Sequence, residues 1–174
     1  MQTFFRLSPP DPPLEGEYLA ELLDAGTGMN NMLATLGFGN PVLPGFWVGK
    51  GFLKGENGRS MGYNLFMEER GRAGRAEGSQ LVRKYRMITR ADVPSVWDGK
   101  PSSELDYRGE THYLGRMEMR DEVREVAPAL YLGLGSFGMR DVRKEQPLPF
   151  LLRGPFHAPL PLGEVMMLDR EAGD

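Results

Sequence analysis

The stretch RMEMRDEVR, residues 116–124, alternates charged side chains with mostly apolar ones at a period of two. Every even position carries a charge, and the sign of that charge alternates along the row. Because successive side chains of a β-strand point to opposite faces, this pattern predicts a strand whose even row faces water. The odd row then faces a core, and it contains Met117, Met119, Val123 and a single carboxylate, Asp121.

Alternating runs of this kind, separated by Gly, Pro, Asn and Asp, continue from residue 40 toward the end of the chain. The predicted strands cover residues 45–53, 61–68, 80–89, 105–108, 110–126 with a bend at Gly115, 130–139, 150–152 and 165–168. Asn57-Gly58 between the first two strands is typical of a tight hairpin turn. We therefore expect a mainly β protein that forms a single antiparallel barrel of about eight strands.

The two ends of the chain have a different sequence pattern from the predicted strands. Prolines dominate residues 9–13, which predicts an extended arm, and apolar residues at helical spacing predict two short helices over 17–24 and 27–37. The Pro-rich stretch 147–161 predicts an irregular C-terminal wrap. Residues 1–40 should thus pack as an arm with short helices on a barrel formed by residues 41–174, within one structural domain.

Composition excludes several classes of function. The 174 residues include no cysteine, which excludes disulfides, thiolate catalysis and thiolate zinc sites. A net charge of −3 with mixed signs argues against nucleic acid as a partner. No stretch approaches the roughly 18 consecutive apolar residues of a membrane helix, and no signal sequence is recognisable. We expect a cytoplasmic protein, either a monomer or a homodimer.

The core-facing rows of the predicted strands are rich in methionine and tyrosine. Methionine is flexible and polarizable, and tyrosine adds a hydroxyl to an apolar ring, so both suit an irregular organic ligand. The candidate ligand-binding residues are Tyr63, Leu65, Tyr85, Met87, Met117, Met119 and Tyr131. A filled barrel would use the same residues, so the pattern leaves an open and a packed interior as alternatives.

Asp121 is the candidate general acid or base, because it is the one carboxylate in an apolar row. Burial there would raise its pKa unless a cation or a hydrogen-bond donor supports the charge. The alternative is a structural anchor that pairs with an arginine of a neighbouring strand or lies beyond the barrel rim.

The sequence GFWVGKGF, residues 45–52, opens the first predicted strand of the barrel region. Its Gly-x-Trp-x-Gly pattern resembles the lipocalin (calycin) superfamily, and in particular small bacterial lipocalin-like domains that carry this motif. The resemblance implies a barrel whose open end admits a hydrophobic ligand, with Trp47 packed as a structural plug across the other end.

A related haem-binding barrel family shares the motif but needs a proximal histidine near the chain end. Only His157 could serve, in the loop-like setting GPFHAP, so we expect no haem and no other cofactor. His112 is the only other histidine, and two histidines without cysteine make a multi-histidine metal site improbable on chemical grounds.

Two functions are compatible with such a barrel. The first is binding of a small, largely apolar or aromatic metabolite in the barrel cavity. The alternative is a biosynthetic enzyme of cyclase or isomerase type that acts on a hydrophobic substrate in the same cavity, since holding reacting atoms together can itself accelerate a ring closure. A filled barrel would instead act through protein contacts, and the sequence does not decide among these three functions.

Overall fold

The computed structural model of the protein describes residues 1–24, 39–40, 45–55, 59–70, 78–108, 111–112, 115–116, 119–137 and 147–168. The strands are β1 Gly16–Leu22, β2 Gly39–Asn40, β3 Gly45–Phe52, β4 Arg59–Arg70, β5 Gly78–Pro94, β6 Pro101–Asp106, β7 Thr111–His112, β8 Gly115–Arg116, β9 Met119–Ala127, β10 Leu130–Phe137 and β11 Leu148–His157. The 3-10 helix η1 covers Phe4–Arg6 and the helix α2 covers Leu162–Val165.

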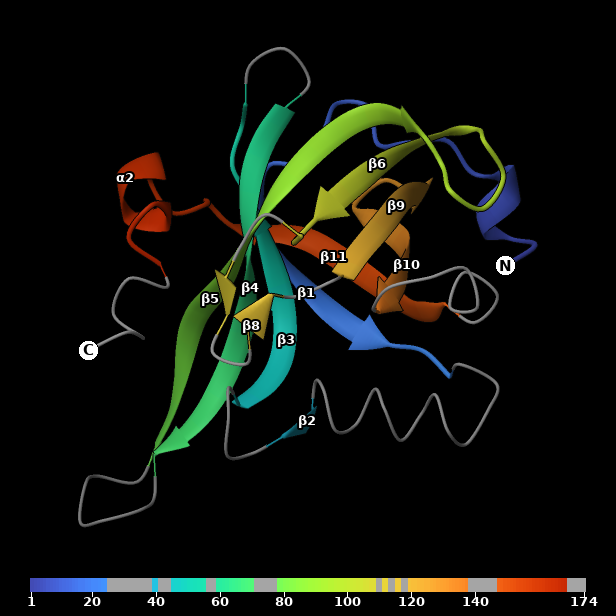
Figure 1. Cartoon of the computed structure of the whole chain (residues 1–174). Helices are drawn as coiled ribbons and strands as arrows, with labels where there is room; N and C mark the ends of the chain where they lie inside the picture. The colour runs from blue at the N-terminus through green and yellow to red at the C-terminus, as the bar shows by residue number, and fades with distance from the viewer. Residues whose placement is uncertain are drawn as a thin grey trace.

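Eight of these strands form a closed antiparallel barrel, as expected (Figure 1). Around the barrel the order is β1-β3-β4-β5-β6-β9-β10-β11, and β11 pairs with β1 to close the ring. Each barrel strand therefore lies beside its neighbours along the chain, which is an up-and-down meander. The short strands β7 and β8 form a separate pair, so the strand expected over 110–126 is divided and its barrel part begins at Met119.

The strand β1 corrects the first predicted helix. Tyr18, Leu19, Leu22 and Leu23 have helical spacing, but Tyr18, Ala20 and Leu22 also form a row of period two that packs in the core, whereas Leu19 is 52% exposed. Pairing with both β3 and β11 satisfies the backbone of this segment and closes the barrel, which an isolated short helix could not do. The second predicted helix, over 27–37, lies outside the described residues.

The C-terminal segment covers the outer face of the barrel and confirms the expected wrap only in part. β11 is longer than the strand predicted over 150–152, and the strand predicted over 165–168 is replaced by the helix α2 and the turn after it. α2 lies against the outside of the barrel in Figure 1. Its fully buried Val165 joins Leu53, Tyr63 and Leu65 in a second apolar cluster, separate from the main core.

The N-terminal arm covers another part of the outer face. Arg124 on β9 donates hydrogen bonds to the Phe4 carbonyl at 3.0 Å and to both carboxylate oxygens of Asp98 at 2.7 and 2.8 Å. Lys100 reaches the Phe5 carbonyl at 2.8 Å. The even row of β9 was expected to face water, but Glu122 and Arg124 are fully buried beneath this arm and residues 95–100.

Candidate ligand-binding site

A cavity of about 540 Å³ occupies one end of the barrel. Its lining includes Leu14, Tyr18, Phe52, Thr89, Leu105 and Tyr131. A volume in this range is typical of sites that hold small organic molecules. The interior of the barrel is thus open at this end.

One arc of the cavity is aromatic. Tyr18 on β1 packs edge-to-face with Phe52 on β3, at 5.5 Å between ring centroids, and with Tyr131 on β10, at 5.6 Å. These strands belong to the continuous run β10-β11-β1-β3 of the barrel. Burial raises the pKa of Tyr18 to about 12, so this ring carries a neutral hydroxyl at any ordinary pH.

The opposite arc carries hydroxyl groups. Ser60 on β4 pairs with Thr89 on β5, and Thr89 pairs with Leu105 on β6, so these three side chains share the face that lines the cavity. The hydroxyls of Ser60 and Thr89 lie 2.5 Å apart and are partly buried. Ser103, two residues before Leu105, also lines this arc.

The N-terminal arm forms part of the cavity wall. Pro12, Pro13, Leu14 and Glu15 all line the cavity, and Leu14 is buried in the main core. The arm is held in place farther upstream, where the Arg124 guanidinium lies 4.4 Å from the centre of the Phe4 ring. The first 15 residues therefore complete the site.

Below the cavity the barrel contains a polar cluster, which consists of Lys50, Asn64, Tyr107 and Asp121. The ammonium of Lys50 lies 3.0 Å from Asp121 Oδ2 and donates to Asn64 Oδ1 at 3.0 Å and to the Tyr107 hydroxyl. Trp47 Nε1 also donates to Asn64 Oδ1, at 3.1 Å. All of these side chains are buried, so they satisfy one another in place of water.

Three aromatic rings surround the Lys50 ammonium. Its Nζ lies 5.1 Å from the centre of Trp47, 5.0 Å from Tyr107 and 5.3 Å from Phe150. Burial lowers the pKa of Lys50 and raises the pKa of Asp121, and the attraction between the two charges opposes both shifts. Burial also raises the pKa of Tyr107 well above its ordinary value. The rings and the carboxylate together replace the hydration of the cation.

Two glycines of β10 make room for this layer. A Cβ on Gly133 would lie 2.1 Å from the Phe150 ring, and a Cβ on Gly135 would lie 2.9 Å from Asp121 Oδ1. The glycine-rich sequence of this strand therefore admits the aromatic cage and the carboxylate.

The structure distributes the predicted site residues over three places. Of those that it describes, Tyr131 lines the large cavity, whereas Tyr85, Met87 and Met119 pack in the main core without lining it. Met117 lies outside the described residues. Asp121 does not line the large cavity either, but borders a void of about 10 Å³ beside Lys50.

Tyr63 and Leu65 lie on the outer face, which corrects the expected register of β4. Their side chains pack in the second apolar cluster under the C-terminal segment, while Asn64 and Phe66 face the interior. The Tyr63 hydroxyl donates to Glu17 at 2.8 Å and accepts from the Leu160 N–H at 2.8 Å. The outward row is apolar because the C-terminal segment covers it, whereas the inward row contains Asn64 of the polar cluster, so the rule that places the apolar row inside oriented this strand wrongly.

Sequence reasoning missed most of the cavity lining. Tyr18 was assigned to a helix, and Phe52, Ser60 and Thr89 were not singled out although each continues an alternating row. Lys50 carried a usable signal, since a lysine in the apolar strand 45–53 and an aspartate in an apolar row are natural partners.

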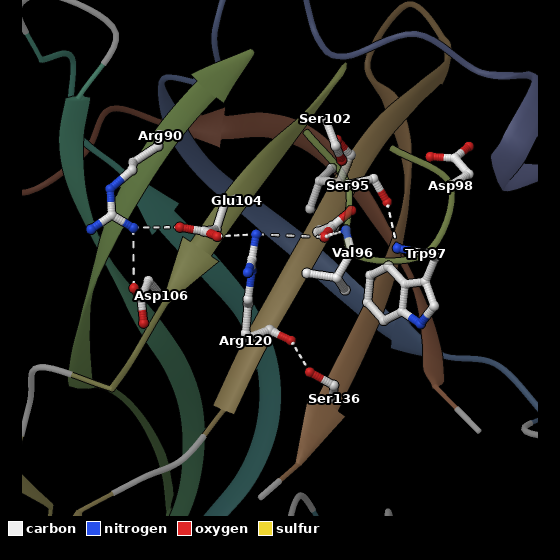
Figure 2. Close-up of polar contacts among 12 residues, drawn as sticks. Arg90, Ser95, Val96, Trp97, Asp98, Ser102, Glu104, Asp106, Arg120 and Ser136 are labelled. Atoms are coloured by element: carbon white, nitrogen blue, oxygen red, sulfur yellow. Dashed lines mark hydrogen bonds and ion pairs between the residues drawn. The ribbon is translucent and has the colours of Figure 1, made fainter. Parts of the chain in front are cut away.

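A polar network runs across the outer face of β5, β6 and β9, as Figure 2 shows. Arg90 binds Glu104 and Asp106, and Arg120 bridges Glu104 and Glu122. Glu122 also accepts from the Val96 N–H at 2.8 Å, and burial raises the pKa of this carboxylate. The network holds residues 95–100 against the barrel, and its Arg90 also lines the rim of the cavity.

No protein-family model, curated protein or solved structure matches this chain. Within the described ranges, no helix is long and apolar enough to cross a membrane. In the same part of the chain, no three His, Asp or Glu side chains come together as a metal site.

Proposed function

We propose that the protein binds a small, largely apolar or aromatic molecule in the cavity at the open end of the barrel. The observation that carries this proposal is the cavity of about 540 Å³ with Tyr18, Phe52, Leu105 and Tyr131 in its lining. Preformed apolar cavities with a few polar groups are the usual solution for such ligands. The Gly-x-Trp-x-Gly stretch supports assignment of the barrel to the lipocalin-like type, with Trp47 packed edge-to-face on Phe150 away from this cavity.

Binding is favoured over catalysis by the position of the candidate acid and base groups. Asp121 and Tyr107 bond to Lys50 and Asn64 within the polar cluster, and neither lines the large cavity. Asp121→Asn should therefore leave ligand binding nearly unchanged. Reduced turnover of an identified substrate in this variant, with binding intact, would instead favour the cyclase or isomerase alternative.

The direct test fills the cavity. Ala91 lines it, so Ala91→Trp should weaken binding of the uncharged dye N-phenyl-1-naphthylamine by about tenfold or more, because the indole takes the ligand's place. Ala158→Trp is the matched control, since Ala158 is exposed and is not among the lining residues. Native mass spectrometry of protein purified from its own host should detect a bound small molecule that Ala91→Trp loses. Equal dye binding by all three proteins would contradict the proposal.

A further inference from the structure

The cavity has two chemically different walls on opposite arcs of the barrel. Its aromatic residues come from β1, β3 and β10, whereas its serine and threonine hydroxyls come from β4, β5 and β6. A purely aliphatic ligand would leave the hydroxyl wall without a partner, and a strongly polar ligand would lose water against the aromatic wall. The two walls together select for a ligand with two different ends.

We propose that the ligand combines a flat aromatic or conjugated ring with an uncharged oxygen acceptor, a carbonyl or a hydroxyl, which binds the Ser60–Thr89 pair. This inference rests on the proposed function and specifies the class of molecule that the same cavity takes. The ring packs against Tyr18, Phe52 and Tyr131 from the cavity side.

The aromatic wall suits a flat ring because its own rings are already set at steep angles. Tyr18 stands at 80° to Phe52 and at 79° to Tyr131. Rings in such edge-to-face contact differ in orientation, so the wall that they form offers ring faces as well as ring edges to a ligand in the cavity. A planar guest can therefore make the offset or edge-to-face contacts that aromatic groups prefer.

The hydroxyl wall offers a hydrogen-bond donor. Ser60 and Thr89 carry two hydroxyl hydrogens, and one of them is used in the 2.5 Å bond between the two oxygens. The second hydrogen is available to an acceptor, and a bond that already links the pair strengthens the remaining donor. A carbonyl or hydroxyl oxygen on the ligand meets this requirement.

The charges near the rim favour an uncharged oxygen over a carboxylate. Arg90 lines the cavity, but its Nη1 atom bonds to both Glu104 and Asp106, so a carboxylate on the ligand would approach two negative charges. Lys54 and Glu15 add one charge of each sign at exposed positions of the rim. The cavity therefore has no net attraction for an anion.

The test uses three probes of similar size. The first is 2-acetylnaphthalene, which has both the flat ring and the oxygen acceptor. The second, 2-ethylnaphthalene, lacks the oxygen, and the third, 2-acetyldecahydronaphthalene, lacks the flat ring. Displacement of the uncharged dye N-phenyl-1-naphthylamine measures their affinities. We expect 2-acetylnaphthalene to bind about three- to tenfold more tightly than either other probe, as one net hydrogen bond or one aromatic contact implies.

The double variant Ser60→Ala/Thr89→Val removes both hydroxyls at almost constant volume. It should abolish the preference for 2-acetylnaphthalene over 2-ethylnaphthalene, while Ser136→Ala, which removes a hydroxyl bonded to the Arg120 carbonyl, should keep the preference. If the double variant does not fold, Thr89→Val alone should reduce the preference.

Equal affinity of all three probes, with each weakened by Ala91→Trp, would overturn this inference and leave the proposed function in place. Failure of all three probes to bind would overturn it too. The proposed function fails separately, when the dye binds the wild type and Ala91→Trp equally.

Discussion

The Lys50 ammonium on β3 lies 3.0 Å from the Asp121 carboxylate on β9, and both side chains are almost completely shielded from solvent. The two strands are on different parts of the barrel wall, so this ion pair spans the interior. The sequence predicted that a buried Asp121 needs a cation or a hydrogen-bond donor. The structure supplies a lysine from across the barrel and not an arginine of a neighbouring strand.

Removal of one partner of this pair should lower the free energy of unfolding far more than removal of both partners. Lys50→Met or Asp121→Asn leaves a buried charge without its counterion, which should lower the free energy of unfolding by about 3–5 kcal/mol. The double variant Lys50→Met/Asp121→Asn should lose much less unfolding free energy than the two single variants lose in sum, as measured by urea unfolding. Lys84→Met is the control, because the Lys84–Glu68 pair is 35% exposed at both side chains and should contribute less than about 1 kcal/mol. Additive losses would contradict the pairing.

Tyr63→Phe should reduce stability without changing ligand affinity. The variant removes the donor to the buried Glu17 carboxylate and the acceptor of the Leu160 N–H, which should cost about 1–3 kcal/mol of unfolding free energy. Dye binding should stay within about twofold of wild type, since Tyr63 does not line the cavity. Thermal unfolding and dye titration measure the two effects. Weakened binding at unchanged stability would show that Tyr63 contacts the ligand.

Gly133→Ala should destabilise the barrel because the Phe150 ring occupies the space that a Cβ would need, at 2.1 Å. Overpacking of this kind costs about 1–3 kcal/mol. Gly78→Ala is the matched control, since a Cβ there meets nothing within 4 Å. Adding Phe150→Leu to Gly133→Ala should recover part of the loss in urea unfolding. A loss no larger than that of Gly78→Ala would contradict the close contact.

The Asp98–Arg124 pair should make stability depend on pH in the acid range. The Arg124 guanidinium lowers the pKa of Asp98 from 3.8 to about 2, so the folded state binds this proton more weakly than the unfolded state. The stabilisation is therefore fully present above pH 3.8 and is lost as the pH falls through about 2. It amounts to about 2 kcal/mol, which Asp98→Asn should remove at neutral pH.

Unfolding free energies of wild type and Asp98→Asn should thus differ at pH 7 and converge toward pH 2. Asp11→Asn, at an exposed position, is the control and should change little at either pH. A difference between wild type and Asp98→Asn that stays constant across this range would contradict the ion pair.

Local periodicity predicted the features that depend on one strand alone. The inward row of β9 contains Met119, Asp121 and Val123, as the alternation indicates, and β3, β4, β5 and β10 begin and end within a few residues of their predicted bounds, except that β5 runs on to Pro94. This worked on β9 because side chains alternate between the two faces of a strand, and the apolar row of this strand is the one that faces the barrel interior. It failed on β1, where the same few apolar residues satisfy both a helical and a strand period.

On β5, an irregular strand pairing prevented a correct prediction of which side chains face the barrel interior. The register between β4 and β5 shifts between Gly62 and Asn64, and Tyr85 on the bulged strand has a φ of 57°. A bulge of this kind changes which residues of a strand face inward. Arg83 therefore points outward to Glu17 while Met87 on the same strand is inside.

The amino-acid sequence by itself determined the class of fold, because alternating polarity and turn residues are local and specify antiparallel strands wherever they occur. Only the tertiary structure decided where the cavity lies, because its walls come from distant strands: Tyr18 and Tyr131 are 113 residues apart in the sequence, and barrel closure brings their rings to 5.6 Å. It also decided that Asp121 meets Lys50, since the low dielectric of a shared interior forces buried charges into pairs that no sequence spacing reveals.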